Sequence, residues 1–221
     1  MAHVGLGLVG YYQFIRGYPL GPELKKRLEL IEWSEHHVDI KEMNWGPVAI
    51  VQDFQASDVS YDRMVLVAAV ARGAKTGAVT CRRWIGGELD VMAVQQRIFE
   101  AVTGIISVDN LLVIGEHFGI WPRELIVIEV EIPDNSIGNL VMEELKINRR
   151  DGRGAIIGQR AMSTVVEKIV ERIVDSTRLA VGRGVAGMTD LLPLSVDDLN
   201  PPVDLCHNHL IEVPRSAAPI H

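Results

Sequence analysis

Cysteine and aromatic residues are scarce in this sequence, and their scarcity excludes several kinds of protein. The two cysteines, Cys81 and Cys206, lie far apart and outside any C-x-x-C spacing. This argues against a disulfide framework and against a thiolate zinc site, and it fits a reducing compartment. Because aromatic residues make up 5% of the chain, we expect a core built mostly from Val, Ile, Leu and Met side chains.

A basic excess is also missing, as is any long uncharged apolar run. The formal net charge is −7, so the chain has no surplus of cations to neutralise phosphates, and we expect no nucleic-acid partner. No uncharged apolar run reaches the roughly 18 residues that a membrane span needs, and we expect no membrane partner. The first residues lack a basic stretch followed by an apolar one, so we expect a cytoplasmic protein.

The most informative apolar run covers residues 62–70, where a charged pair precedes the sequence MVLVAAV. Such a run is typical of a strand that is buried on both faces of a parallel sheet. With the other hydrophobic patterns it predicts the element order β-α-β-α-β-β-α-α-β-α-α. We expect strands at 2–9, 38–43, 63–70, 78–84 and 125–132, and helices that include 20–36, 91–102, 109–118, 136–148 and 159–180.

This order predicts an α/β fold with three α/β/α layers around a mainly parallel, twisted central sheet. We expect one domain over residues 1–180 and a C-terminal tail over residues 181–221, where Pro and Gly increase and periodicity is lost. Leu191, Leu192 and Leu194 make this tail too apolar for a free linker. Since segments of about 40 residues rarely fold alone, we expect the tail to pack on its own domain or on a second subunit of a homo-oligomer.

Four blocks of the sequence, taken in their order and spacing, resemble a known protein family. Over residues 3–175 the chain resembles the nickel–iron hydrogenase maturation endopeptidases, which trim the C-terminus of the nickel-bearing large subunit. The resemblance implies the α/β fold of that family. The blocks are Gly5-Leu6-Gly7 with Gly17-Tyr18-Pro19-Leu20, then Met43-Asn44-Trp45-Gly46-Pro47, then the strand 62–70, and finally Asp109 through Gly119 and Pro122 into the strand 125–131 with Glu131.

The same resemblance places the metal ligands of the family at positions that hold no ligand in this chain. The first acid falls at Ile15 or Arg16, the second acid falls at Ala68, and the histidine falls near Thr103. A methyl group cannot ligate a cation, and an arginine repels one. The resemblance therefore implies the scaffold without its nickel contacts, and we expect no catalytic residue, no metal and no cofactor there.

Two interpretations of the function remain open. The first, which we favour, is a non-catalytic relative of the family that acts as a protein-binding assembly factor or a structural subunit. The second is an active C-terminal processing endopeptidase whose ligands have moved to Asp53, Asp58 or the pair His207 and His209. With Cys206 these histidines form a C-H-x-H pattern, but the absence of a nearby fourth donor favours polar residues of an irregular tail over a zinc or nickel site.

Two further short patterns have structural interpretations. Gly5, Gly7 and Gly10 fit the G-x-G-x-x-G fingerprint of dinucleotide binding, which would make the chain a small-molecule enzyme. The aromatic loop that follows does not open directly into a helix, which counts against that interpretation. We expect His36 and His37 to end the first helix, where imidazolium groups complement the helix dipole.

Aromatic residues concentrate in the loop that follows the first predicted strand. Tyr and Arg are the side chains that most often anchor contacts between proteins. The resemblance implies that this end of the sheet grips the hydrogenase substrate, so we expect a protein partner such as a hydrogenase-like large subunit. The predicted contact residues are those of this loop and of the turn after the second strand: Tyr11, Tyr12, Phe14, Arg16, Tyr18, Asn44, Trp45 and Gly46.

Overall fold

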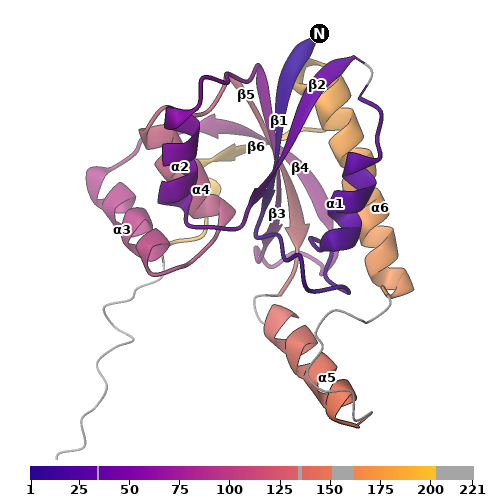
Figure 1. Cartoon of the computed structure of the whole chain (residues 1–221). Coiled ribbons are helices and arrows are strands. Elements are labelled where there is room, and N and C mark those ends of the chain that lie inside the picture. The colour runs from indigo at the N-terminus through magenta and orange to yellow at the C-terminus, as the bar shows by residue number, and fades with distance from the viewer. Residues whose placement is uncertain (34, 134–135, 151–161, 203–221) are drawn as a thin grey trace, which may run out of the picture.

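A single twisted sheet forms the centre of the molecule in the computed structural model, which describes residues 1–33, 35–133, 136–150 and 162–202 (Figure 1). The strand order is β2-β1-β3-β5-β4-β6. The first four strands of this order run parallel, β4 is antiparallel to β5, and β6 is parallel to β4. The strands are β1 (Ala2–Val9), β2 (His36–Met43), β3 (Arg63–Val70), β4 (Val79–Gly86), β5 (Glu124–Glu131) and β6 (Leu192–Ser195).

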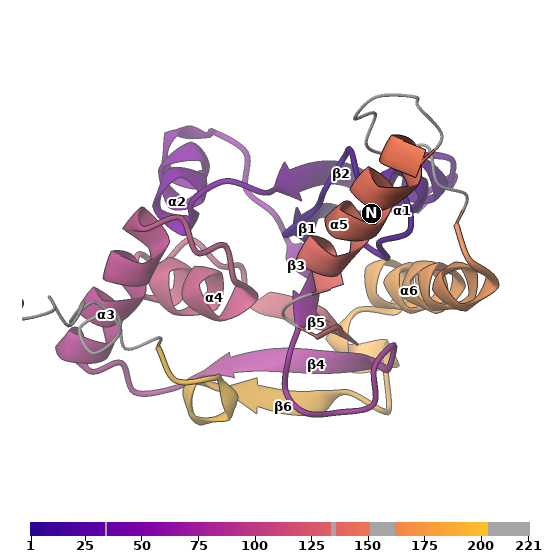
Figure 2. The same cartoon turned by 90° about the horizontal axis from the view of Figure 1, so that it is seen from below.

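Helices cover both faces of this sheet, which confirms the predicted three-layer α/β/α fold class. Two helices lie on one side of the sheet and three on the other, where α3 packs on α2 and α4, and α5 lies beyond the carboxyl ends of the parallel strands (Figures 1 and 2). None of the described helices has the length and apolar character needed to cross a bilayer. The first face carries α1 (Pro22–Glu29) and α6 (Thr164–Arg183), the second carries α2 (Pro47–Ala56), α3 (Val91–Val102) and α4 (Val108–His117), and α5 is Ser136–Arg150.

The central strands are apolar along their whole length because both of their faces are covered. Successive side chains of β3 point to opposite faces, so Val65 packs in the core beneath α1 and α6 while Leu66 packs in the core beneath α4. Both side chains are fully buried. The uninterrupted hydrophobic pattern of residues 64–70 is thus the sequence signature of a strand between two helical layers.

The glycines of β1 serve packing, which removes the structural basis for a phosphate loop. Gly5 and Gly7 lie inside the strand, and β1 continues to Val9. A Cβ atom on Gly7 would lie 2.6 Å from Met43 Sδ, and one on Gly5 would lie 2.5 Å from Met64 Cε. These glycines therefore make room for neighbouring methionines.

The first helix and the second strand divide residues 20–43 differently from the prediction. Helix α1 ends at Glu29, and β2 already begins at His36. The expected placement of His36 and His37 at a helix end is therefore wrong. His36 Nδ1 accepts a hydrogen bond of 3.3 Å from Ala2 N, and His36 Nε2 lies 3.3 Å from the Gly182 carbonyl oxygen. Pairing with β1 and contact with α6 thus override the local helical pattern.

Part of the C-terminal tail is a strand of the same sheet. The short strand β6 pairs with β4, and Leu194 is fully buried in the core on the α4 side. In the turn that follows, Asp198 Oδ2 accepts hydrogen bonds of 2.8 Å from both Ser195 N and Ser195 Oγ. The described part of the tail therefore packs on its own domain, which is one of the two arrangements that we expected.

Replacing Leu194 by Ala should destabilise the protein by about 2 to 5 kcal/mol, because the change removes a fully buried side chain and leaves a cavity. Leu192 lies in the same strand but is 51% exposed, so Leu192→Ala should cost less than about 0.5 kcal/mol. Urea unfolding of the two variants measures both values. Equal effects of the two substitutions would show that β6 is not part of the folded core.

Candidate functional site

A cleft of about 290 Å³ opens at the carboxyl ends of β1, β3 and β5. Ligands of open α/β sheets bind at this end of the strands, so the cleft is the first candidate for a functional site. Figure 2 views the molecule from this side, with α5 in front of the sheet. The lining residues that carry polar side chains are Tyr12, Tyr18, Ser107, Asp109, Ser136 and Asn200.

The three positions that the resemblance equates with metal ligands offer no donor to this cleft. Ala68 is 1% exposed and packs among the apolar side chains beneath α4. Arg16 is directed to the surface, where its Nε lies 3.4 Å from Glu23 Oε1. Thr103 ends α3, and its hydroxyl donates a hydrogen bond of 2.7 Å to the Glu100 carbonyl. Each position thus has a structural role.

Arg72 is the second residue after β3, and its guanidinium binds two carboxylates, one of which, Asp109, lines the cleft. Its Nη2 lies 2.7 Å from Asp109 Oδ1, and its Nε donates a hydrogen bond of 2.7 Å to Glu129 Oε1. The second oxygen of Asp109 accepts a hydrogen bond of 3.1 Å from Asn200 N. Arg82 completes the group, with its Nε 2.9 Å from Glu129 Oε2. We call Arg72, Arg82, Asp109 and Glu129 the arginine–carboxylate cluster.

The side chains of the cluster are largely buried, and its positive and negative charges form ion pairs with one another. The side chains of Arg72, Asp109 and Glu129 are 11%, 8% and 4% exposed. Burial lowers the pKa of Arg72, but the hydrogen bonds and charges of Glu129 and Asp109 outweigh it and raise the pKa above its ordinary value. The guanidinium therefore stays charged, and Asp109 is held as its counter-ion. A carboxylate engaged in this way is a poor general base and a poor metal ligand.

The Glu131 side chain binds backbone N–H groups close to the same cluster. Its carboxylate accepts hydrogen bonds of 2.9 to 3.1 Å from the N–H groups of Arg72 and Gly73. This fixes the turn that directs the Arg72 side chain toward Asp109. Arg72, Asp109 and Glu129 were not predicted as a group, because they come from three separate parts of the chain. The single signal in the sequence was an arginine two residues after the carboxyl end of the central strand.

Five of the eight predicted partner-binding residues line the cleft or a second cavity beside it, and Arg16, Trp45 and Gly46 line neither; the residues also differ in exposure. Tyr11 and Tyr18 are 4% and 3% exposed and belong to the core. Phe14, Trp45 and Tyr12 are 69%, 47% and 39% exposed. We call the second cavity at this end, of about 320 Å³, the aromatic groove; it is lined by Gly10, Tyr11, Tyr12, Gln13, Phe14, Ile15, Asn44, Ile106 and Val141.

The relocated ligands considered above do not line the cleft in the described part of the chain. Asp53 on α2 accepts a hydrogen bond of 3.2 Å from Lys41 Nζ, and Asp58 is exposed in the loop after α2. Cys206, His207 and His209 lie outside the described residues. Asp109 lies in the first turn of α4 but is not its N-terminal cap, because Ser107 Oγ accepts the hydrogen bond from Asn110 N. Asp109 instead forms the ion pair with Arg72.

No family model and no curated protein sequence matches the chain. Among solved structures, it is similar to an endopeptidase from Escherichia coli, at 15% identity over 85% of this chain and 95% of that one, with a TM-score of 0.48. It is also similar to a hydrogenase 2 maturation peptidase from a Thaumarchaeota archaeon, at 16% identity over 82% and 99% of the two chains, with a TM-score of 0.43.

A third similar structure is the hydrogenase maturating endopeptidase HybD from Escherichia coli, at 15% identity over 84% of this chain and 94% of that one, with a TM-score of 0.44. These likenesses are distant, so the residues of this chain must decide what its cleft can do.

Replacing Arg72 by Gln should destabilise the protein by about 3 to 5 kcal/mol, because Asp109 and Glu129 then stay buried without their cation. Arg83 is exposed on β4, next to Arg82 in the sequence. Arg83→Gln is the matched control and should change the stability by less than about 0.5 kcal/mol. Urea unfolding at neutral pH compares the two. A loss below about 1 kcal/mol for Arg72→Gln would contradict a structural role of the cluster.

Proposed function

We propose that the chain is a non-catalytic relative of the hydrogenase maturation endopeptidases, which acts as a protein-binding assembly factor or a structural subunit. The observation that carries this proposal is the state of Asp109. It is the one carboxylate among the described residues that line the cleft, and Arg72 and the Asn200 backbone occupy both of its oxygens. A nickel-assisted hydrolysis needs free imidazole or carboxylate donors.

The aromatic groove supports the protein-binding part of the proposal. Phe14 and Trp45 are large apolar side chains that stay well exposed. Phe14 lines the groove, and Trp45 follows Asn44, which lines the groove from a second loop. Arg16 is also exposed and lies two residues after Phe14 in the same loop. Aromatic residues and arginine are enriched among the residues that contribute most to protein–protein binding. The partner that the sequence resemblance favours is the large subunit of a hydrogenase.

The alternative is an active processing endopeptidase that uses relocated ligands. Of the candidates, Asp53 is engaged by Lys41, while His207 and His209 belong to the segment after residue 202, which the structure does not describe. This alternative predicts a shortened large subunit as product. The first proposal predicts a complex with an uncut partner.

Incubation with the immature large subunit encoded in the same genome distinguishes the two. We expect binding in a size-exclusion or calorimetric measurement, with no C-terminal cleavage seen by intact mass. Phe14→Ser should weaken this binding at least about tenfold, since it removes an exposed aromatic anchor. Phe118, which is 44% exposed at the far end of α4, provides the control: Phe118→Ser should leave the affinity unchanged.

Cleavage of the large subunit that His207→Ala or His209→Ala abolishes would overturn the non-catalytic proposal and establish the alternative. Absence of any complex at micromolar concentrations would contradict the assembly role. Stoichiometric nickel in the purified protein, lost on chelation, would also contradict a cleft without metal ligands.

A further inference from the structure

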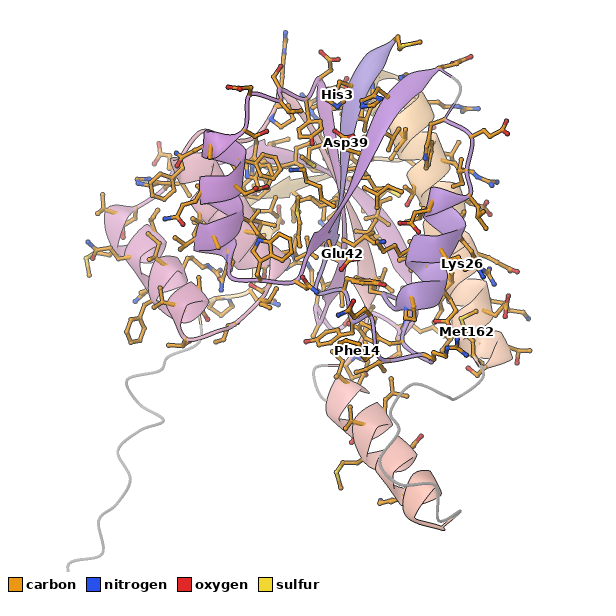
Figure 3. All side chains as sticks on the ribbon, in the orientation of Figure 1. His3, Phe14, Lys26, Asp39, Glu42 and Met162 are labelled. Atoms are coloured by element: carbon orange, nitrogen blue, oxygen red, sulfur yellow. The ribbon has the colours of Figure 1, made fainter. Side chains whose placement is uncertain are left out.

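Three potential metal ligands gather at the end of the sheet that is opposite to the cleft. Strands β1 and β2 are parallel, and their register pairs His3 with His37. Asp39 follows two residues after His37, so its side chain points to the same face of the sheet. The face is the one that α2 covers, since Tyr61 and Phe54 lie beside these residues. Figure 3 labels His3 and Asp39 there, at the end of β1 and β2 remote from α5.

The donor atoms are close enough to share one ion. His3 Nε2 lies 2.8 Å from Asp39 Oδ2, and His37 Nε2 lies 3.4 Å from Asp39 Oδ1. The ligand atoms of all three side chains lie within 4.8 Å of one another. In a tetrahedral zinc site, metal–ligand bonds of about 2.0 to 2.1 Å put neighbouring donor atoms roughly 3.3 Å apart. Small side-chain rotations would bring these three atoms to that spacing.

The surroundings orient the carboxylate as metal sites require. Tyr61 donates a hydrogen bond of 3.2 Å to Asp39 Oδ2. Gly5 allows Tyr61 to sit here, because a Cβ on Gly5 would lie 3.3 Å from Tyr61 Cδ1. An outer-shell hydrogen bond of this kind holds a ligating carboxylate in position.

Charge and exposure at this end also suit a divalent cation. Asp62 Oδ2 accepts a hydrogen bond of 2.8 Å from His3 N, which adds a second carboxylate beside the group. The nearest cation of β2, Lys41, is engaged by Asp53 at 3.2 Å. The side chains of His3, Asp39 and His37 are 28%, 35% and 70% exposed. A metal held by these three would therefore keep a side open to water.

We propose that His3, His37 and Asp39 form a zinc site that joins the edge strand β2 to β1. Two imidazole nitrogens and one carboxylate oxygen are a zinc donor set, and water takes the fourth position. The ion would replace the hydrogen bond between His3 Nε2 and Asp39 Oδ2, since both of these atoms would then face the metal. The site is independent of the proposed function, because it lies away from both the cleft and the aromatic groove.

Zinc titration of untagged, metal-stripped, full-length protein tests the site. We expect one zinc per chain, and a Co²⁺ complex with the intense visible absorption of a four-coordinate site. At free zinc about a hundred times the dissociation constant, the Tm should rise by about 5 to 10 °C, because the ion binds only the folded arrangement. Zinc sites in folded proteins have dissociation constants far below about 100 µM. Absence of zinc binding up to this concentration would therefore overturn the proposal.

Single substitutions assign the ligands. His3→Ala, His37→Ala and Asp39→Asn should each weaken zinc binding at least about tenfold, and Tyr61→Phe should weaken it about 10- to 100-fold. His37 is the most exposed of the three, so His37→Ala keeps the test valid even if another variant fails to fold.

Two controls separate this site from other histidines. His117→Ala removes an exposed histidine of α4 and should leave zinc binding and the zinc-induced rise in Tm unchanged. The variant Cys206→Ser/His207→Ala/His209→Ala should also bind one zinc with unchanged affinity. Loss of binding in that variant, with wild-type affinity retained in His37→Ala, would place the zinc in the C-terminal segment and overturn the proposal.

Discussion

The structure depends on one buried cation, the guanidinium of Arg72, at the point where the chain leaves the central strand. It contacts Asp109 at the start of α4, Glu129 near the end of β5, and the Asp198 carbonyl in the C-terminal segment. A guanidinium buried to this extent is tolerated only when all of its partners are present. The helix, the strand and the C-terminal turn must therefore reach their places together.

This interaction also determines what the cleft can do. Where a hydrolytic site would keep a carboxylate available to a metal or a water molecule, the local carboxylate here is already neutralised and hydrogen-bonded. The methyl group of Ala68 lies in the adjoining core and adds no donor. The proposed function therefore rests on the surface of the molecule, because a fold does not by itself carry an activity.

The fold was largely predictable because it depends on local pattern: the apolar strand 63–70 and the helix 91–102 were predicted with the bounds that the structure has. The sites were not, because their residues meet only after folding. Arg72 is 37 residues from Asp109, and His3 lies 36 residues from Asp39. The strand β6 was also missed as a strand, since its four residues include a proline and lack a visible alternation.

That proline has a consequence for how copies of the molecule meet. Strand β6 is the outer edge of the sheet, and an exposed edge is a template on which another chain can add a strand. Pro193 has no N–H to offer, and its carbonyl accepts a hydrogen bond of 3.2 Å from Arg82 Nη1. With only four residues and this proline, β6 closes the β4 side of the sheet against edge-to-edge aggregation.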